Sequence, residues 1–141
     1  MSKLVVHATS LSLLVGREWR GVLILGPSGV GKSDFALRAM GEGWSLVSDD
    51  YSCLWSSGGH LYAAPPEAIQ GKLEIRGQGI SEERIRRQTR IHLCALAQTD
   101  PVERMPDAEI TPLLGHDIPT LRLNPREASS LPKLLTRLRA T

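Results

Sequence analysis

The sequence predicts an α/β fold in which a mixed sheet is flanked by helices, built as a single domain over residues 1–141. Four observations support this class. Residues 21–25 form a short apolar run that is typical of a buried strand, and residues 33–40 follow a helical pattern. A glycine-rich loop stands between them, and other short apolar runs recur along the chain. A strand, a glycine loop and a helix in this order are typical of α/β sheets that hold phosphate at the loop.

The remaining elements follow from apolar alternation, turn residues and helical spacing. Strands are expected at residues 4–15, 21–25, 44–50, 51–55, 60–63, 73–80, 91–97, 108–112 and 118–123. A single helical turn is expected at 67–70, and residues 81–90 are typical of a charged, solvated surface. Ser130 is expected to cap a last helix, because the leucines that follow it share one helical face; these are Leu131, Leu134, Leu135 and Leu138.

The composition narrows the class of protein. With 41% hydrophobic and 23% charged residues, the chain is ordinary for a globular domain. A net charge of +2 without a long basic run gives no reason to expect a nucleic-acid partner. No apolar run approaches the roughly 18 residues of a membrane span, and no signal-peptide core is present. Cys53 and Cys94 lie far apart among apolar neighbours, as reduced thiols do. We therefore expect a cytoplasmic enzyme.

The glycine-rich loop fits the phosphate-binding pattern G-x-x-x-x-G-K-[ST] without a mismatch. Its nucleotide-binding residues are predicted to be Gly26, Pro27, Ser28, Gly29, Val30, Gly31, Lys32 and Ser33. Glycines let backbone N–H groups approach phosphate oxygens, and the helix N-terminus adds partial positive charge. Lys32 is expected to reach the outer phosphates and the Ser33 hydroxyl to ligate Mg²⁺. The alternative is a glycine-rich turn that matches by chance, which fits the flanking strand and helix less well.

Two acids, Asp49 and Asp50, are the last residues of the strand expected at 44–50. In open α/β sheets, ligands lie beyond the carboxyl ends of the strands, so both acids should lie near the phosphates and the metal. Neighbouring strand residues point to opposite faces, which predicts two different tasks, one beside Mg²⁺ and one facing the incoming nucleophile. The alternative is a solvated strand end. His7 on its own is typical of a strand histidine whose ring is hydrogen-bonded.

Three separated motifs occur in one order: residues 26–33, the strand end at 46–50, and the run Glu74-Ile75-Arg76-Gly77-Gln78-Gly79-Ile80. Together they resemble the catalytic domain of bacterial HPr kinase/phosphorylase, most specifically in the third motif. The resemblance weakens after about residue 105. It implies a P-loop fold of the HPr kinase and PEP carboxykinase type, with ATP and Mg²⁺. It also implies a kinase for a seryl residue of the phosphocarrier protein HPr, a phosphorylase that reverses the reaction with inorganic phosphate, and a hexamer.

The resemblance assigns roles position by position. Asp50 matches the general base of phosphorylation, which acts as an acid in the reverse reaction. The resemblance also changes the interpretation of His7 from a structural strand histidine to an active-site residue. Catalytic roles are implied for His7, Lys32, Asp50, Arg76 and Arg104. Metal ligation is implied for Ser33, Asp49 and Glu74.

The chain departs from the family in two places. The first active-site match is already His7, so a short form without the family's N-terminal domain is expected. The C-terminal loop that serves dephosphorylation has its best counterpart at residues 118–125, which keep Arg122 but lack a glycine and a second arginine. Two other functions compete: a P-loop kinase of a small metabolite, and a nucleotide-sensing regulator that transfers nothing. No mobile lid with arginines precedes Glu74, which disfavours the first, and the set Lys32, Asp50 and Glu74 disfavours the second.

Overall fold

The computed structural model describes residues 2–66, 72–75, 79–82 and 86–141. Its helices are α1 (Lys32–Gly41) and α2 (Ser130–Arg139). Its strands are β1 (Lys3–Val6), β2 (Ala8–Val15), β3 (Glu18–Leu25), β4 (Ser45–Ser48), β5 (Ser52–Ser57), β6 (His60–Ala64), β7 (Lys72–Ile75), β8 (Gly79–Glu82), β9 (Thr89–Ala97), β10 (Glu109–Leu113) and β11 (His116–Leu123).

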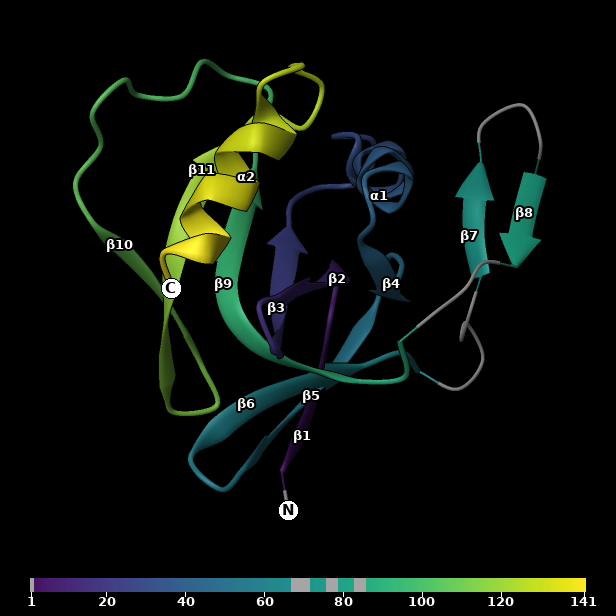
Figure 1. Ribbon diagram of the computed structural model, residues 1–141, viewed down its shortest axis with the longest axis vertical. Coiled ribbons are helices and arrows are strands. Elements are labelled where there is room, and N and C mark those ends of the chain that lie inside the picture. Colours follow the sequence, from purple (N-terminus) through teal and green to yellow (C-terminus); the bar gives the residue numbers. More distant parts are fainter. Residues whose placement is uncertain (1, 67–71, 76–78, 83–85) are drawn as a thin grey trace.

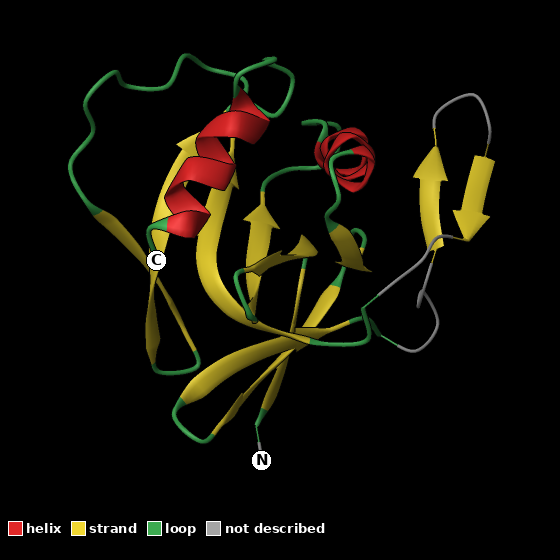
Figure 2. Ribbon diagram, in the orientation of Figure 1, coloured by secondary structure: helices red, strands yellow, loops and turns green. Residues whose placement is uncertain are grey.

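Within these ranges nine strands form one mixed sheet. Their order is β1-β5-β6-β9-β3-β2-β4, with β11 also paired to β9 and β10 to β11, while β7 and β8 form a separate two-stranded sheet (Figure 1). Figure 2 shows the two helices in red against the yellow strands. The α/β fold with a mixed sheet and flanking helices is thus confirmed. No helix in the described ranges is long and apolar enough to cross a membrane.

The pairing register brings several strand ends to one edge of the sheet. β3 and β9 run parallel with Leu25 opposite Leu96, and β9 and β11 run parallel with Leu123 opposite Ala97. These three strands therefore end together. β2 is antiparallel to β3, with Ala8 opposite Leu25, so β2 begins at this edge. β4 is antiparallel to β2 and ends here too. We call this the loop edge, because the phosphate loop leaves β3 at it.

The two faces of the sheet are buried by different elements. One face packs against α1 and α2; its buried residues include Val22, Ile24, Leu93 and Ala95 from strands and Phe35, Ala39, Leu131, Leu134 and Leu138 from helices. The other face of β3 and β9 packs against the β5–β6 hairpin, which belongs to the same sheet through the pairing of β6 with the start of β9; the buried residues there include Leu23, Cys94, Leu54, Leu61 and Ala63. The predicted leucine face of α2 is confirmed. Cys53 and Cys94 are both free thiols, as expected.

Three predictions about elements were wrong. Residues 4–15 are two strands, because the chain changes partners at His7: β1 pairs with β5, and β2 pairs with β3 and β4. Residues 73–80 do not form one strand, since β7 and β8 pair antiparallel with Ile75 opposite Gly79. Ser129 and not Ser130 stands at the N-cap of α2, and the Ser130 hydroxyl donates to the Glu127 carbonyl instead. The turn predicted at 67–70 lies outside the described residues.

Candidate functional site

The phosphate loop connects the end of β3 to the start of α1. Gly31 is the N-cap of α1 with φ of 108°, and Gly29 has φ of 82°, both in the left-handed region that a side chain strains. Gly26 has the carbonyl of Ala97 only 2.9 Å from the position of an added Cβ, so β9 leaves no room for a side chain there. The glycines therefore serve loop conformation and close packing against β9.

Lys32 is the first residue of α1 and is almost fully buried. Its ammonium donates to the carbonyls of Gly26 and, at 3.2 Å, Pro27. Burial lowers the Lys32 pKa, and the charges of Asp50 and Asp49 oppose this. The ammonium thus lies in the loop itself, held by groups that a phosphate oxygen could replace as its partner.

Asp49 follows β4 at the loop edge and is 8% exposed. Both oxygens of its carboxylate accept from the Ser33 hydroxyl, at 2.9 and 3.0 Å, and Oδ1 also accepts from the Thr9 hydroxyl at 3.1 Å. Burial raises the Asp49 pKa above its ordinary value; the hydrogen bonds from Ser33 and Thr9 oppose this shift and the charge of Asp50 adds to it. Asp49 is therefore tied to the helix that follows the phosphate loop.

Asp50 lies beside Asp49 but faces a different partner. Its carboxylate Oδ1 is 2.6 Å from Nε2 of His7, and the two side chains are 55% and 35% exposed. Its φ is 69°, a left-handed conformation that is uncommon outside glycine. The His7 ring also stacks on Tyr51, with ring centroids 5.1 Å apart and planes at 27°. The pair is thus solvent-accessible at the same edge as the loop.

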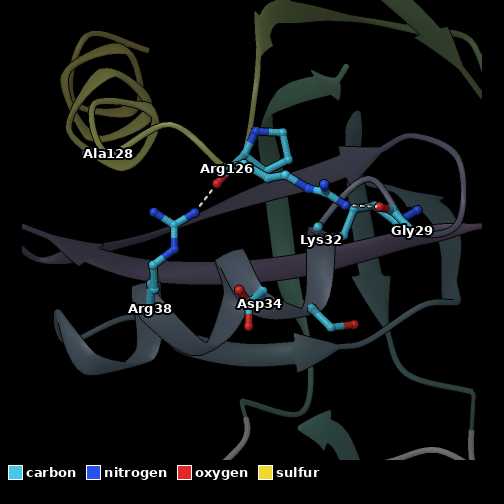
Figure 3. Close-up of a pocket in the computed structure, with 9 residues that line it drawn as sticks. Gly29, Lys32, Asp34, Arg38, Arg126 and Ala128 are labelled. Atoms are coloured by element: carbon cyan, nitrogen blue, oxygen red, sulfur yellow. Dashed lines mark hydrogen bonds between the residues drawn. The ribbon is translucent and has the colours of Figure 1, made fainter. Parts of the chain in front are cut away.

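A polar pocket of about 640 Å³ opens beside the loop and the start of α1. Arg126 crosses from the segment after β11 and donates to the Gly29 carbonyl at 2.5 Å, and Arg38 of α1 donates to the Pro125 carbonyl (Figure 3). The sequence motifs did not single out either arginine. For Arg126 the available signal is the strand expected at 118–123, because parallel strands of one sheet end at the same edge and deliver the residues that follow them to it.

The structure says less about the other predicted site residues, Glu74, Arg76 and Arg104. β7, which contains Glu74, lies beside α1 (Figure 1), and Arg76 lies outside the described residues. Arg104 is exposed in the connection from β9 to β10, which runs on the side of β11 away from α1 (Figure 1). No hydrogen bond recorded among the described residues joins Arg104 to the site. The roles of these three residues stay predictions.

The hydroxyl oxygen of Ser33 on α1 and the carboxylate oxygens of Asp49 after β4 suit a hard divalent cation. Ser33 and Asp49 present a hydroxyl and a carboxylate in contact with each other, which are ligand types that Mg²⁺ prefers. Within the described part of the chain, no three His, Cys, Asp or Glu side chains gather around one point. Among the described residues, the candidate metal ligands at this point are therefore the Ser33 hydroxyl and the Asp49 carboxylate.

Comparison with known proteins adds to this geometry. The model of the family described as HPr Serine kinase C-terminal domain matches residues 3–137. The chain belongs to this family. A solved structure, the HPr(Ser) kinase/phosphatase from Coxiella burnetii, superposes with a TM-score of 0.78 and 25% identity, over 96% of this chain and 87% of that one. The fold of the HPr kinase type that the resemblance implies is confirmed.

Two curated relatives show how much of a longer protein the chain resembles. The HPr kinase/phosphorylase of Bordetella pertussis is 36% identical over 118 residues, which cover 75% of this chain and 37% of that protein. The one of Brevibacillus brevis is 51% identical over 61 residues, which cover 43% of this chain and 20% of the relative. The chain thus spans well under half the length of the curated relatives that it matches.

Proposed function

We propose that this chain transfers the γ-phosphate of ATP to a seryl hydroxyl of the phosphocarrier protein HPr. The observation that supports this most is the Asp50 carboxylate, which is exposed, hydrogen-bonded to His7 and placed at the same sheet edge as the phosphate loop. A loop that only bound nucleotide would need no accessible carboxylate beside it. Membership of the HPr kinase family supports the choice of acceptor.

On this proposal the phosphate loop holds the donor. Backbone N–H groups at the start of α1 face the β- and γ-phosphates, and the helix dipole favours their charge. Lys32 exchanges the Gly26 and Pro27 carbonyls for a phosphate oxygen, which gives the ammonium a charged partner in place of two dipoles. Arg126 stands close enough to the loop to contribute a second cation.

Asp50 acts on the acceptor. Its carboxylate takes the proton of the serine hydroxyl while the serine oxygen bonds to the γ-phosphorus and the bond from that phosphorus to the bridging oxygen of ADP breaks. His7 fixes the Asp50 carboxylate at Oδ1, which leaves Oδ2 for the hydroxyl. Orientation is the larger part of this task, because a loose transition state needs little early proton removal.

Mg²⁺ fits beside Ser33 and Asp49, with Glu74 proposed as a further ligand. Once bound, the ion offsets negative charge on the phosphates. Arg76 and Arg104 are proposed as catalytic on the family resemblance alone. We further propose a cytoplasmic protein that acts as a homo-oligomer, a hexamer by that resemblance, without nucleic acid or membrane as partner.

The deciding experiment is phosphotransfer to purified HPr from the same cell, run forward with ATP and backward with phosphorylated HPr and inorganic phosphate. Forward transfer to serine is expected, and Asp50→Asn should lower it by about a hundredfold or more while ATP still binds. Asp117→Asn is the matched control. It removes the same charge from an exposed position near the start of β11, which is the end of that strand away from the loop edge. Transfer to a metabolite panel but not to HPr would refute the acceptor, and unimpaired transfer by Asp50→Asn would refute the base.

A further inference from the structure

A buried hydroxyl, that of Thr9, lies between the two acids of the site. Thr9 is on β2 and is fully buried. Its Oγ1 donates to Oδ1 of Asp49 at 3.1 Å and accepts from the backbone N–H of Asp50 at 3.2 Å. One atom therefore contacts the side chain of the first acid and the backbone of the second, and a hydroxyl is the smallest group that can donate and accept at once.

Each contact adds a constraint to one of the two acids. The Asp49 carboxylate is held from the α1 side by Ser33, and Thr9 holds it from the β2 side. Asp50 has left-handed backbone at φ 69°, a conformation that persists in non-glycine residues when surrounding contacts hold it. The bond from its N–H to Thr9 is such a contact. His7, two residues before Thr9, then meets the Asp50 carboxylate.

We propose that Thr9 is a positioning residue for phosphoryl transfer: its hydroxyl fixes Asp49 toward Ser33 and fixes the backbone of Asp50 so that the Asp50 carboxylate meets His7. No phosphate-binding or acidic motif contains Thr9, and it reaches the site only through the start of β2 at the loop edge. The inference rests on the proposed function for its kinetic test and on the structure alone for its second test.

The kinetic test compares variants that differ in the hydroxyl. Thr9→Val keeps the shape and removes the hydroxyl, Thr9→Ala removes it with less bulk in case the valine variant fails to fold, and Thr9→Ser restores it. Thr89→Val is the matched control. Like Thr9, Thr89 is a buried threonine whose hydroxyl bonds another side chain, here that of Ser12, and it lies at the end of β9 away from the loop edge. The hydroxyl-free variants are expected to lose at least about tenfold in kcat with less than about threefold change in KM, since misplacement of a reacting group by about 1 Å costs up to a hundredfold.

The second test needs no turnover. Exchange of the Asp50 amide hydrogen, followed by NMR, should be about fivefold to tenfold faster in Thr9→Val than in wild type, the factor expected from one lost hydrogen bond. Thr9→Ser should exchange at nearly the wild-type rate and recover kcat to within about threefold, and Thr89→Val should match wild type in both measurements.

The two hypotheses fail separately. If the wild-type protein transfers nothing to HPr, the proposed function is refuted, and the exchange rate of Asp50 alone decides the role of Thr9. If the wild-type protein is active, a wild-type kcat in the hydroxyl-free variants, an unchanged Asp50 exchange rate, or a loss in Thr9→Ser as large as in Thr9→Val each overturns the positioning role.

Discussion

Replacing His7 and Asp50, singly and together, tests whether the two side chains act as one unit. The variants are His7→Gln, Asp50→Asn and the double substitution. Each change removes one partner of the 2.6 Å contact between Nε2 and Oδ1 while keeping a side chain of similar size. If His7 acts only by holding the Asp50 carboxylate, it has nothing left to hold once that carboxylate is an amide.

The exposed fractions of the two side chains set the size of the effect on folding. At 35% and 55% exposure the pair is well solvated, so it contributes no more than about 1 kcal/mol to the free energy of unfolding. For a chain of this size that is a change of about 3–4 °C in Tm. The effect on turnover is expected to be larger: about a hundredfold or more for Asp50→Asn and about tenfold for His7→Gln. A tenfold coupling corresponds to about 1.4 kcal/mol.

The assay is steady-state transfer from ATP to HPr, with unfolding followed in parallel. The double variant is expected to be no slower than Asp50→Asn alone, because residues that act as a unit are not additive. His116→Gln is the control, since His116 also bonds a side chain through Nε2, to Ser56 at 2.7 Å, away from the loop edge. A double variant slower by the full product of the two single effects would refute the unit and give His7 a separate role.

Three further outcomes follow from the structure. Burial raises the pKa of Asp49 in the folded protein above the ordinary 3.8 of the unfolded chain. The contribution of Asp49 to stability is therefore lost as pH rises from the unfolded pKa through the folded pKa. Thermal melts should show Asp49→Asn more stable than wild type at about pH 7, with the difference vanishing toward about pH 4. Arg126→Gln removes the cation that contacts Gly29 and should weaken ATP binding about threefold to tenfold by calorimetry, while Arg137→Gln on α2 leaves it unchanged. Leu134→Ala, at a fully buried position on the inner face of α2, should lower the free energy of unfolding by about 2–5 kcal/mol in urea titrations.

The phosphate loop with its flanking strand and helix could be predicted from sequence because its residues are neighbours in the chain. Strand, loop and helix follow one another over residues 21–41, and apolar periodicity with glycine spacing predicts all three. The break at His7 could not be predicted in this way. Alternation runs on through residues 4–15, and what divides β1 from β2 is their different partners, which are distant in sequence.

Thr9 and Arg126 were missed for the same physical reason. Neither belongs to a motif, and each reaches the site through strand register, Thr9 at the start of an antiparallel neighbour of β3 and Arg126 just after a strand parallel to β9. Local propensity does not encode register between distant strands, because register is set by which faces the assembled sheet buries.

The two adjacent acids differ in burial and backbone conformation, and β4 ends just before them. Asp49 is the buried one, held by hydroxyls from α1 and β2, and its raised pKa shows that the fold tolerates its charge at a cost. Asp50 turns out of the strand direction through a left-handed backbone and stays exposed beside His7. A buried carboxylate is suited to a fixed cation, whose charge offsets the cost of burial, whereas an exposed one is suited to a hydroxyl that arrives on another protein. The proposed roles, metal for Asp49 and acceptor for Asp50, are therefore supported by burial and backbone conformation as well as by sequence resemblance.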